Sequence, residues 1–269
     1  KKIKKMFEIF RYLVFVFFLF ISTNSKALES DWSSGIESQV RLISASTKNN
    51  NESEIYVGLD YKLNDGWKTY WESPGDGGFP QEINWSNSIN IKDVNIDWPV
   101  PNKFEILGMK SIGYSKSIIF PLKIKLIDPE EDTLIILDIN YLVCEDICIP
   151  GNANLELLIP SGLGELTSHS FNLEKSISSL PKRNLKISFL NKAKTSLFFN
   201  EKFVMFKFEA EAKNYFSNPS IFLHTRYGLP VEEPTINYSN NFKKLNAIFK
   251  FDKNLIEDEE IETKIIISD

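Results

Sequence analysis

Short stretches in which apolar residues recur at every second position constrain the fold of this chain more than any other feature. Such stretches, and short unbroken apolar runs, are typical of β-strands, and turn residues such as Asn64-Asp65-Gly66 and Pro150-Gly151 separate them. In the first part of the chain we expect strands at 37–44, 55–62, 89–98, 117–126, 133–143 and 153–159. Many short strands with frequent turns predict an all-β protein built on the immunoglobulin-like sandwich.

The strand pattern stops after Pro160 and resumes further along the chain. In between, residues 161–164 have the composition of a flexible joint, and residues 168–180 predict one short helix that ends before Pro181. A second set of strands is expected at 185–190, 196–199, 203–212, 220–224, 245–251 and 262–267. The sequence therefore predicts two immunoglobulin-like β-sandwich domains, at 28–162 and 183–269, with a linker at 163–182.

The first residues have the layout of a secretory signal peptide. Lysines at positions 1, 2, 4 and 5 precede an unbroken apolar run at 12–21, and Ser25-Lys26-Ala27 places small residues at both positions that determine cleavage. A membrane anchor is the alternative, but the run is about half of the roughly 20 apolar residues that a spanning helix needs. We therefore expect residues 1–27 to be a signal peptide and the mature protein to be exported.

The composition is that of a folded acidic protein. Hydrophobic residues make up 42% of the chain and charged residues 25%, which is enough apolar material for a core. The formal net charge is −5, and removal of residues 1–27, with six cations and one anion, would change it to −10. We therefore expect no nucleic-acid partner. No second apolar stretch approaches membrane length, so we expect membrane contact only through a partner or through a region beyond Asp269.

Cys144 and Cys148 are the only cysteines of the chain, and they lie at the end of the strand expected at 133–143. An exported compartment is oxidising, so a pair this close in sequence can form a disulfide. In an extended strand their Cα atoms would be roughly 13 Å apart, whereas a disulfide requires about 4.4 to 6.8 Å. A disulfide therefore requires a turn at 145–147, where the strand breaks.

The spacing of the cysteines alone leaves several functions open. A structural disulfide is one, although closing a loop of about five residues stabilises a fold by roughly 2 kcal/mol, against roughly 4.7 kcal/mol for about 100 residues. A redox role is equally supported, because a tight surface disulfide is more easily reduced. A zinc site needs four ligands and a cysteine hydrolase needs a paired histidine, yet the only histidines, His169 and His224, lie in other segments. We therefore expect neither a metal nor an organic cofactor.

The segment 141–150, with the sequence YLVCEDICIP, resembles the redox motif of the N-terminal periplasmic domain of the DsbD/ScsB thiol:disulfide interchange reductases. Three upstream stretches resemble further motifs of this family in the same order: the aromatic segment 66–71 followed by the PGDGG segment 73–80, Trp98-Pro99-Val100-Pro101, and Gly113-Tyr114 followed by Phe120-Pro121. The resemblance covers roughly residues 30–160, and the second β domain resembles the two-sandwich arrangement of the ScsB-like branch.

The resemblance implies an immunoglobulin-like domain that relays electrons. In the family, such a domain receives electrons from a membrane-embedded reductase domain or a thioredoxin-like domain. It passes them to oxidised periplasmic partners through a mixed disulfide. By position, Cys148 matches the cysteine that forms mixed disulfides, and Cys144 is then the resolving cysteine. The spacing of the two cysteines is shorter than in the best-known DsbD members and closer to that of the ScsB-like ones.

Two sets of residues are expected near the cysteine pair. Trp67, Tyr70 and Trp71 are candidates to line it, with packing in the sandwich core as the alternative for the tryptophans. Glu145 and Asp146 lie between the cysteines and would raise the pKa of a nearby thiol. A pair with that property reacts mainly when docked on a specific partner. As solvated turn residues, the same two acids would have no such effect.

Family members also carry a loop that caps the disulfide until a partner displaces it. The resemblance places this cap near residues 104–109. Phe104, Leu107 and Met109 are apolar residues in an otherwise polar stretch there, as a lid requires, although ordinary burial would account for them equally well.

Together these features predict an exported thiol:disulfide interchange module in which Cys144 and Cys148 relay reducing equivalents between a membrane reductase or thioredoxin-like protein and oxidised periplasmic partners. The chemistry is that of a protein-disulfide reductase component. Whether the chain is an enzyme in its own right is left open, because it lacks a multi-span membrane region and a thioredoxin-type Cys-x-x-Cys. The alternative is a non-catalytic exported binding or scaffold protein with a structural disulfide.

Overall fold

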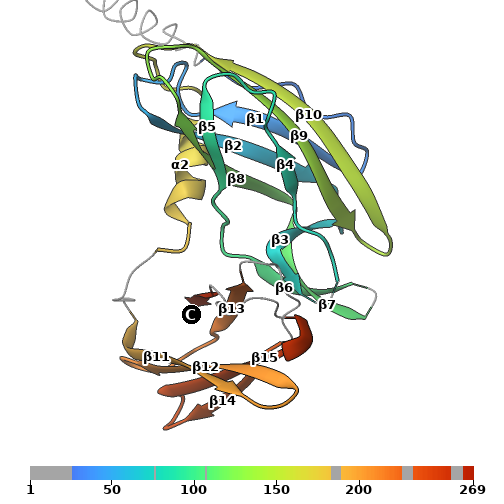
Figure 1. Cartoon of the computed structure of the whole chain (residues 1–269), viewed down its shortest axis with the longest axis vertical. Helices are drawn as coiled ribbons and strands as arrows, with labels where there is room; N and C mark the ends of the chain where they lie inside the picture. Colours follow the sequence, from blue (N-terminus) through green and yellow to red (C-terminus); the bar gives the residue numbers. More distant parts are fainter. Residues whose placement is uncertain (1–25, 76, 107, 183–188, 226–232, 256–262) are drawn as a thin grey trace, which may run out of the picture.

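The structure is a computed structural model, and it describes residues 26–75, 77–106, 108–182, 189–225, 233–255 and 263–269 (Figure 1). Almost all of the expected signal peptide at 1–27 lies outside these residues, as do Leu107 and most of the strand expected at 185–190. Within the described residues, no helix has the length and apolar character needed to cross a membrane.

The N-terminal part of the chain folds into two antiparallel sheets that face each other (Figure 1). One sheet has the strand order β1–β2–β8–β5, formed by β1 (Ser38–Ser44), β2 (Glu54–Leu63), β8 (Ser117–Leu126) and β5 (Ile91–Ile96). The other has the order β10–β9–β3–β7–β6, and β4 pairs with β9. Its strands are β3 (Lys68–Gly75), β4 (Glu82–Asn84), β6 (Asn102–Ile106), β7 (Met109–Ser115), β9 (Thr133–Cys144) and β10 (Cys148–Ile159).

Alternate residues of these strands form one hydrophobic core between the two sheets. Leu59 and Tyr61 of β2 and Leu137 and Ile139 of β9 are completely buried in it. This is the period of two that the sequence pattern predicted, because successive side chains of a strand point to opposite faces. Each fully buried side chain of this kind contributes about 1.5–3 kcal/mol from the burial of apolar surface.

The motifs that carry the family resemblance meet in this core. The Tyr114 hydroxyl donates a hydrogen bond of 2.7 Å to the carbonyl oxygen of Pro99, which links the WPVP segment to β7. The ring of Phe120 lies edge-on against the rings of both Tyr114 and Trp98, with centroids 5.0 and 5.3 Å apart. These motif residues therefore build the scaffold beside the cysteines.

The C-terminal part of the chain forms a second β unit. A four-stranded sheet has the order β11–β12–β15–β14, and β13 pairs with β16. The strands are β11 (Leu190–Phe199), β12 (Phe203–Ala212), β13 (Ser220–Thr225), β14 (Thr235–Ser239), β15 (Lys244–Asp252) and β16 (Thr263–Ser268), with a short 3-10 helix η1 at Lys253–Leu255. Phe206, Phe208 and Phe249 are buried in a core of their own. The fold is therefore all-β with two immunoglobulin-like sandwiches, as the sequence predicted.

The helix expected at 168–180 is present as α2 (Ser170–Ser178). It lies against β8 and β1 of the first domain (Figure 1). Leu173 is its buried residue, and the Ser176 hydroxyl donates a hydrogen bond of 2.6 Å to the carbonyl oxygen of Ile119. The helix is thus attached to the first domain before the chain continues into the second.

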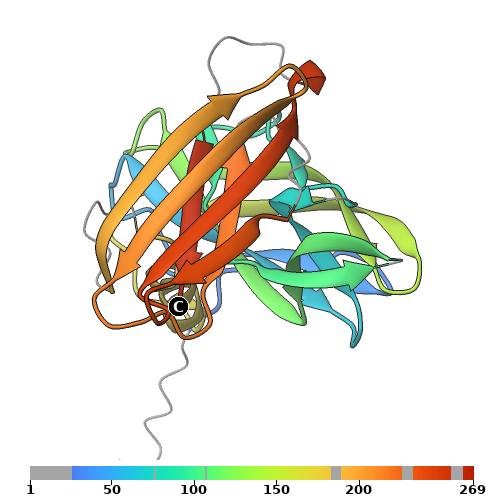
Figure 2. The same cartoon turned by 90° about the horizontal axis from the view of Figure 1, so that it is seen from below.

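The two domains share an apolar contact at β13. Phe222 of β13 belongs to the core of the first domain, whereas its neighbours Ile221 and Leu223 belong to the core of the second. The ring of Phe222 lies edge-on against Trp71 of β3, with centroids 5.9 Å apart. Figure 2 shows the four-stranded sheet of the second domain in the foreground, with the first domain behind it. Strand β13 therefore contributes alternate residues to the two cores.

Candidate functional site

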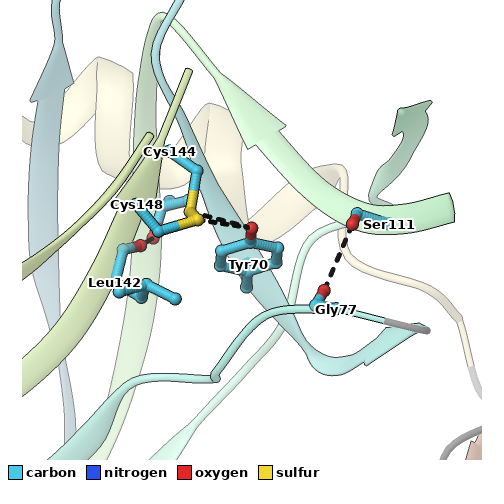
Figure 3. Close-up of a disulfide and its surroundings, with 7 residues drawn as sticks. Tyr70, Gly77, Ser111, Leu142, Cys144 and Cys148 are labelled. Carbon is cyan, nitrogen blue, oxygen red and sulfur yellow. Dashed lines mark hydrogen bonds between the residues drawn. A yellow bond between two sulfur atoms is a disulfide. The ribbon is translucent and has the colours of Figure 1, made fainter. Parts of the chain in front are cut away.

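Cys144 and Cys148 form a disulfide with an S–S distance of 2.09 Å. Cys144 is the last residue of β9 and Cys148 the first of β10, and the two residues face each other in the antiparallel register of the hairpin (Figure 3). Residues 145–147 form the turn, in which the Glu145 amide donates a hydrogen bond of 3.0 Å to the Ile147 carbonyl oxygen. The turn that the disulfide required is therefore present between the cysteines.

The two sulfur-bearing residues differ in their access to solvent. Cys144 is 0% exposed, whereas Cys148 is an exposed residue. Ile147, at the tip of the turn, is 60% exposed although it is apolar. A thiol-containing partner can therefore approach the disulfide from the side of Cys148, next to an apolar contact point, and is kept away from Cys144.

The hydroxyl of Tyr70 forms a hydrogen bond to the buried half of the disulfide (Figure 3). Its hydroxyl donates a hydrogen bond of 3.0 Å to Sγ of Cys144 and lies 3.9 Å from Sγ of Cys148. Tyr70 is 1% exposed, and burial raises the pKa of its hydroxyl. The hydroxyl is therefore protonated at neutral pH and acts as a donor to the sulfur.

Tyr70 reaches the disulfide because β3 separates from β9 at this point. Only Lys68 and Thr69 of β3 pair with β9, opposite Cys144 and Val143. Beyond them, β4 takes over the pairing with β9. The separation leaves space on the outer face of the sheet for the phenol ring.

Gly78 of the PGDGG segment lies against the Tyr70 ring. Gly78 has φ +123°, and a Cβ atom there would lie 2.2 Å from Cε1 of Tyr70, so that only glycine fits. The Ser111 hydroxyl donates a hydrogen bond of 3.1 Å to the Gly77 carbonyl oxygen, which ties the segment to β7 (Figure 3). Gly78 is thus required by the close approach of its backbone to the residue that contacts the disulfide.

The cap expected at 104–109 is a β-hairpin rather than a loop. Strands β6 and β7 pair from Asn102↔Gly113 to Ile106↔Met109. Sequence reasoning missed this hairpin because its apolar residues do not alternate cleanly. Phe104 and Ile106 of β6 pack against Tyr70 and Cys144, and the ring centroids of Phe104 and Tyr70 are 6.1 Å apart.

The other two residues predicted for the cap differ from Phe104. Met109 is 38% exposed, and its side chain lies beside Gly77. Leu107 lies outside the described residues. Ile106, which is 2% exposed, was not predicted as part of the site, although its position two residues after Phe104 places it on the same strand face.

Trp67 and Trp71, expected together with Tyr70, belong to the core of the first domain. Trp71 is completely buried and contacts Phe222 and His224 of the second domain. Adjacent residues of a strand point to opposite faces, so Tyr70 and Trp71 cannot both face the disulfide. Of the aromatic trio, Tyr70 is the member that the structure brings to the cysteines.

Glu145 and Asp146 are exposed residues of the turn. The carboxylate of Glu145 lies over Gly66, where an added Cβ would meet Oε1 of Glu145 at 1.8 Å. Gly66 has φ +87°, which also favours glycine. Both acids therefore lie in the turn between the two cysteines, and Glu145 also packs on Gly66, at the start of the aromatic segment 66–71.

Two linked side-chain hydrogen bonds hold β9 next to the disulfide. The Thr69 hydroxyl donates a hydrogen bond of 3.1 Å to the carbonyl oxygen of Leu142, and the Gln81 side-chain amide donates one of 3.1 Å to the Thr69 hydroxyl. Both residues are buried. The sequence carried no signal for Gln81, because the contact depends on the loop that brings it back to β3.

Residues 39–160, which include both cysteines, match the family described as "Thiol:disulfide interchange protein DsbD, N-terminal". Among solved structures, the crystal structure of the N-terminal periplasmic domain of ScsB from Proteus mirabilis matches with a TM-score of 0.71 and 20% identity, over 91% of this chain and 94% of that chain. No curated protein matches.

The structural match extends beyond the family match, because it covers both β domains. At 20% identity it shows a common fold. The family match covers the part of the chain between β1 and the end of β10, and so includes the disulfide and the aromatic and glycine motifs. Residues 39–160 of this chain therefore form a domain of the DsbD N-terminal family of thiol:disulfide interchange proteins.

Proposed function

We propose that this chain is a periplasmic thiol:disulfide interchange module in which Cys144 and Cys148 are the redox couple. The observation that carries the proposal is the asymmetry of the disulfide, with an exposed Cys148 and a buried Cys144 that accepts a hydrogen bond from Tyr70. A purely structural disulfide needs neither a solvent-accessible sulfur nor a hydrogen-bond donor to its second sulfur. Exchange needs an accessible sulfur, and a donor on the leaving sulfur assists it.

The exchange would begin at Cys148. A partner thiolate attacks Sγ of Cys148, a bond forms between the two sulfurs, and the bond to Cys144 breaks. The electron pair of that bond remains on Cys144, which leaves as a thiolate. A second thiolate of the partner then attacks the mixed disulfide at the partner's own sulfur and releases Cys148. Two electrons have then passed to the pair, and the partner carries the disulfide.

The reverse sequence would reduce a downstream protein. The Cys148 thiolate attacks an oxidised disulfide and forms a mixed disulfide, and Cys144 attacks Cys148 to release the reduced substrate. In both directions negative charge appears on Cys144, next to the Tyr70 hydroxyl. A hydrogen bond to the charged form stabilises it, so Tyr70 would assist the departure of Cys144 in the first sequence and would keep Cys144 ionised for its attack in the second.

The β6–β7 hairpin would serve as the cap of the site. Phe104 and Ile106 cover Tyr70 and Cys144 from one side, and Met109 is exposed near the tip of the hairpin. A partner that displaces this hairpin would reach both sulfurs. Glu145 and Asp146, both exposed in the turn, would disfavour a thiolate without a partner and so limit unspecific exchange.

Thioredoxin-like periplasmic proteins and a membrane-embedded reductase domain are the partners that we propose. The expected signal peptide supports this location, and so does the structural similarity to a domain described as periplasmic. The rival function is that of a non-catalytic exported binding or scaffold protein with a structural disulfide. The two functions differ in the reduction potential of the disulfide.

The reduction potential tests the proposal. The oxidised protein is equilibrated with glutathione or thioredoxin redox buffers, and free thiols are trapped by alkylation and counted by mass spectrometry. We expect a potential above about −300 mV, in the range where thioredoxin-like proteins exchange. A potential well below about −300 mV would indicate a structural bond and support the scaffold function.

A further inference from the structure

The β6–β7 hairpin lies between the disulfide and the second domain (Figure 1). Its residues divide between two faces, because cross-strand pairs point to the same side and successive residues to opposite sides. One face carries Phe104 and Ile106 and contacts Tyr70 and Cys144. The other face carries Lys103, Glu105, Lys110 and Ile112, which pair across the two strands. This second face is turned toward the second domain.

Glu233 of the second domain binds both strands of the hairpin. Its Oε2 lies 2.5 Å from Nζ of Lys110 on β7, and its Oε1 lies 3.5 Å from Nζ of Lys103 on β6. The hydrogen bond from Lys110 lowers the pKa of the Glu233 carboxyl, so the carboxyl is ionised at neutral pH. One carboxylate therefore joins the two strands of the hairpin to the second domain.

The apolar part of this contact is not closely packed. A cavity of about 220 Å³ lies between the hairpin and the second domain. Ile112 lines it from the hairpin, and Phe222 and Phe249 line it from the second domain. Because apolar packing does not fix the hairpin on this side, its position depends more on the ion pairs beside the cavity than that of a closely packed hairpin would.

We propose that Glu233 is a positioning residue that holds the β6–β7 hairpin closed over the disulfide through Lys103 and Lys110. The second domain then controls access to the Cys144 side of the redox pair, although it contributes no atom to that pair. A partner that neutralises Glu233, or that moves the second domain, frees the hairpin and exposes Tyr70 and Cys144. This inference rests on the proposed function and adds to it a device that couples the domains to the site.

The test compares rates of disulfide reduction in the full oxidised chain. Reduction by dithiothreitol at low ionic strength is followed by alkylation of the thiols at timed intervals. We expect Glu233→Gln to be reduced about two- to fivefold faster than the unmodified chain, as the loss of one or two exposed ion pairs allows. Raising the salt concentration should increase the rate of disulfide reduction in the unmodified chain, because salt screens exposed charges. The difference in rate between Glu233→Gln and the unmodified chain should then become smaller.

Glu209→Gln is the matched control. Glu209 also pairs with a lysine in the second domain, Lys207, at 2.8 Å, but it does not contact the hairpin. We expect this variant to be reduced at the unmodified rate. We expect the disulfide of Glu233→Lys to be reduced fastest. Adding Lys110→Glu to this variant should move the rate of reduction back toward that of the unmodified chain. Thermal unfolding of each oxidised variant establishes that the fold is retained.

The outcomes separate this inference from the proposed function. If Glu233→Gln and Glu209→Gln are reduced at the same rate, Glu233 does not position the hairpin, and the redox function stands. The same conclusion follows if the rate of Glu233→Gln exceeds the unmodified rate equally at low and high salt, because the effect would not be ionic. A disulfide that resists dithiothreitol in every variant would overturn the proposed function together with this inference.

Discussion

The hydroxyl of Tyr70 lies 3.0 Å from Sγ of Cys144 and donates its hydrogen to the one sulfur of the disulfide that solvent does not reach. In the exchange that we propose, Cys144 carries negative charge, and a buried sulfur cannot rely on water for stabilisation. In this site the phenol hydroxyl takes the place of water. The relationship links the aromatic motif at 66–71 directly to the chemistry of the cysteine pair.

Removal of this donor should slow exchange. In Tyr70→Phe the ring is retained and the hydrogen bond is lost, so we expect reduction by a thioredoxin-like protein to be about five- to tenfold slower, as the loss of one buried hydrogen bond implies. Stopped-flow fluorescence of the tryptophans measures the rate. Tyr61→Phe is the matched control, because the buried Tyr61 hydroxyl has no hydrogen-bond partner among the described residues. Equal rates for the two variants would show that Tyr70 has no part in exchange.

A side chain at Gly78 should disturb the site through Tyr70. In Gly78→Ala the new Cβ would collide with the Tyr70 ring and would also require a positive φ. We expect a loss of about 1–3 kcal/mol in the free energy of unfolding, together with a changed exchange rate. Gly108→Ala shares the positive φ, but its Cβ would meet nothing within 4 Å. Urea denaturation of both oxidised variants separates the collision from the backbone strain, and an equal loss in the two would exclude the collision.

The stability of the protein should depend on pH through Glu72. Burial raises the pKa of this carboxyl from its ordinary value of 4.5 to about 7, and Lys264 acts in the opposite direction. The Glu72 carboxylate lies 3.5 Å from Nδ1 of His224, across the contact between the domains. Because the folded-state pKa is raised, the contribution of Glu72 to stability is fully present below pH 4.5 and is lost as the pH rises through about 7.

Glu72→Gln removes this titration and provides the test. Relative to the unmodified chain, we expect the variant to gain about 2–3 kcal/mol in free energy of unfolding between pH 4.5 and pH 8. Urea denaturation across this range measures the gain. Glu209→Gln is the control, because hydrogen bonding to Lys207 lowers the pKa of Glu209, and this gives the opposite dependence on pH. A stability difference between Glu72→Gln and the unmodified chain that does not change with pH would contradict the account.

Much of the fold could be predicted from local pattern. The strands 117–126 and 203–212 were predicted with the bounds of β8 and β12. Buried and less buried residues alternate along the whole of β12, whereas β8 has an unbroken apolar run at 118–122 and alternates beyond it. The turn at 145–147 followed from disulfide geometry alone. These features depend on residues that are close in sequence.

The features that the sequence did not reveal depend on contacts between distant segments. The β6–β7 hairpin has neighbours on both faces, so it lacks the alternation that identifies a half-exposed strand. Strand β10 was expected to begin at Ala153 and instead begins at Cys148, because Pro150 and Gly151 are accommodated in an edge strand of the sheet. Phe222 joins the core of the first domain from the second, which no local pattern indicates.

The central claim is that Cys148 exchanges with partners while Cys144 resolves, and capture of a mixed disulfide tests it most directly. Full-length Cys144→Ser and Cys148→Ser are each mixed with a thioredoxin-like protein that lacks its resolving cysteine and whose remaining cysteine is activated as a mixed disulfide. The captured complex is quantified on non-reducing gels. We predict that Cys144→Ser, which retains the exposed Cys148, captures the probe at least about tenfold faster than Cys148→Ser. Faster or equal capture by Cys148→Ser, or no capture by either variant, would contradict the account.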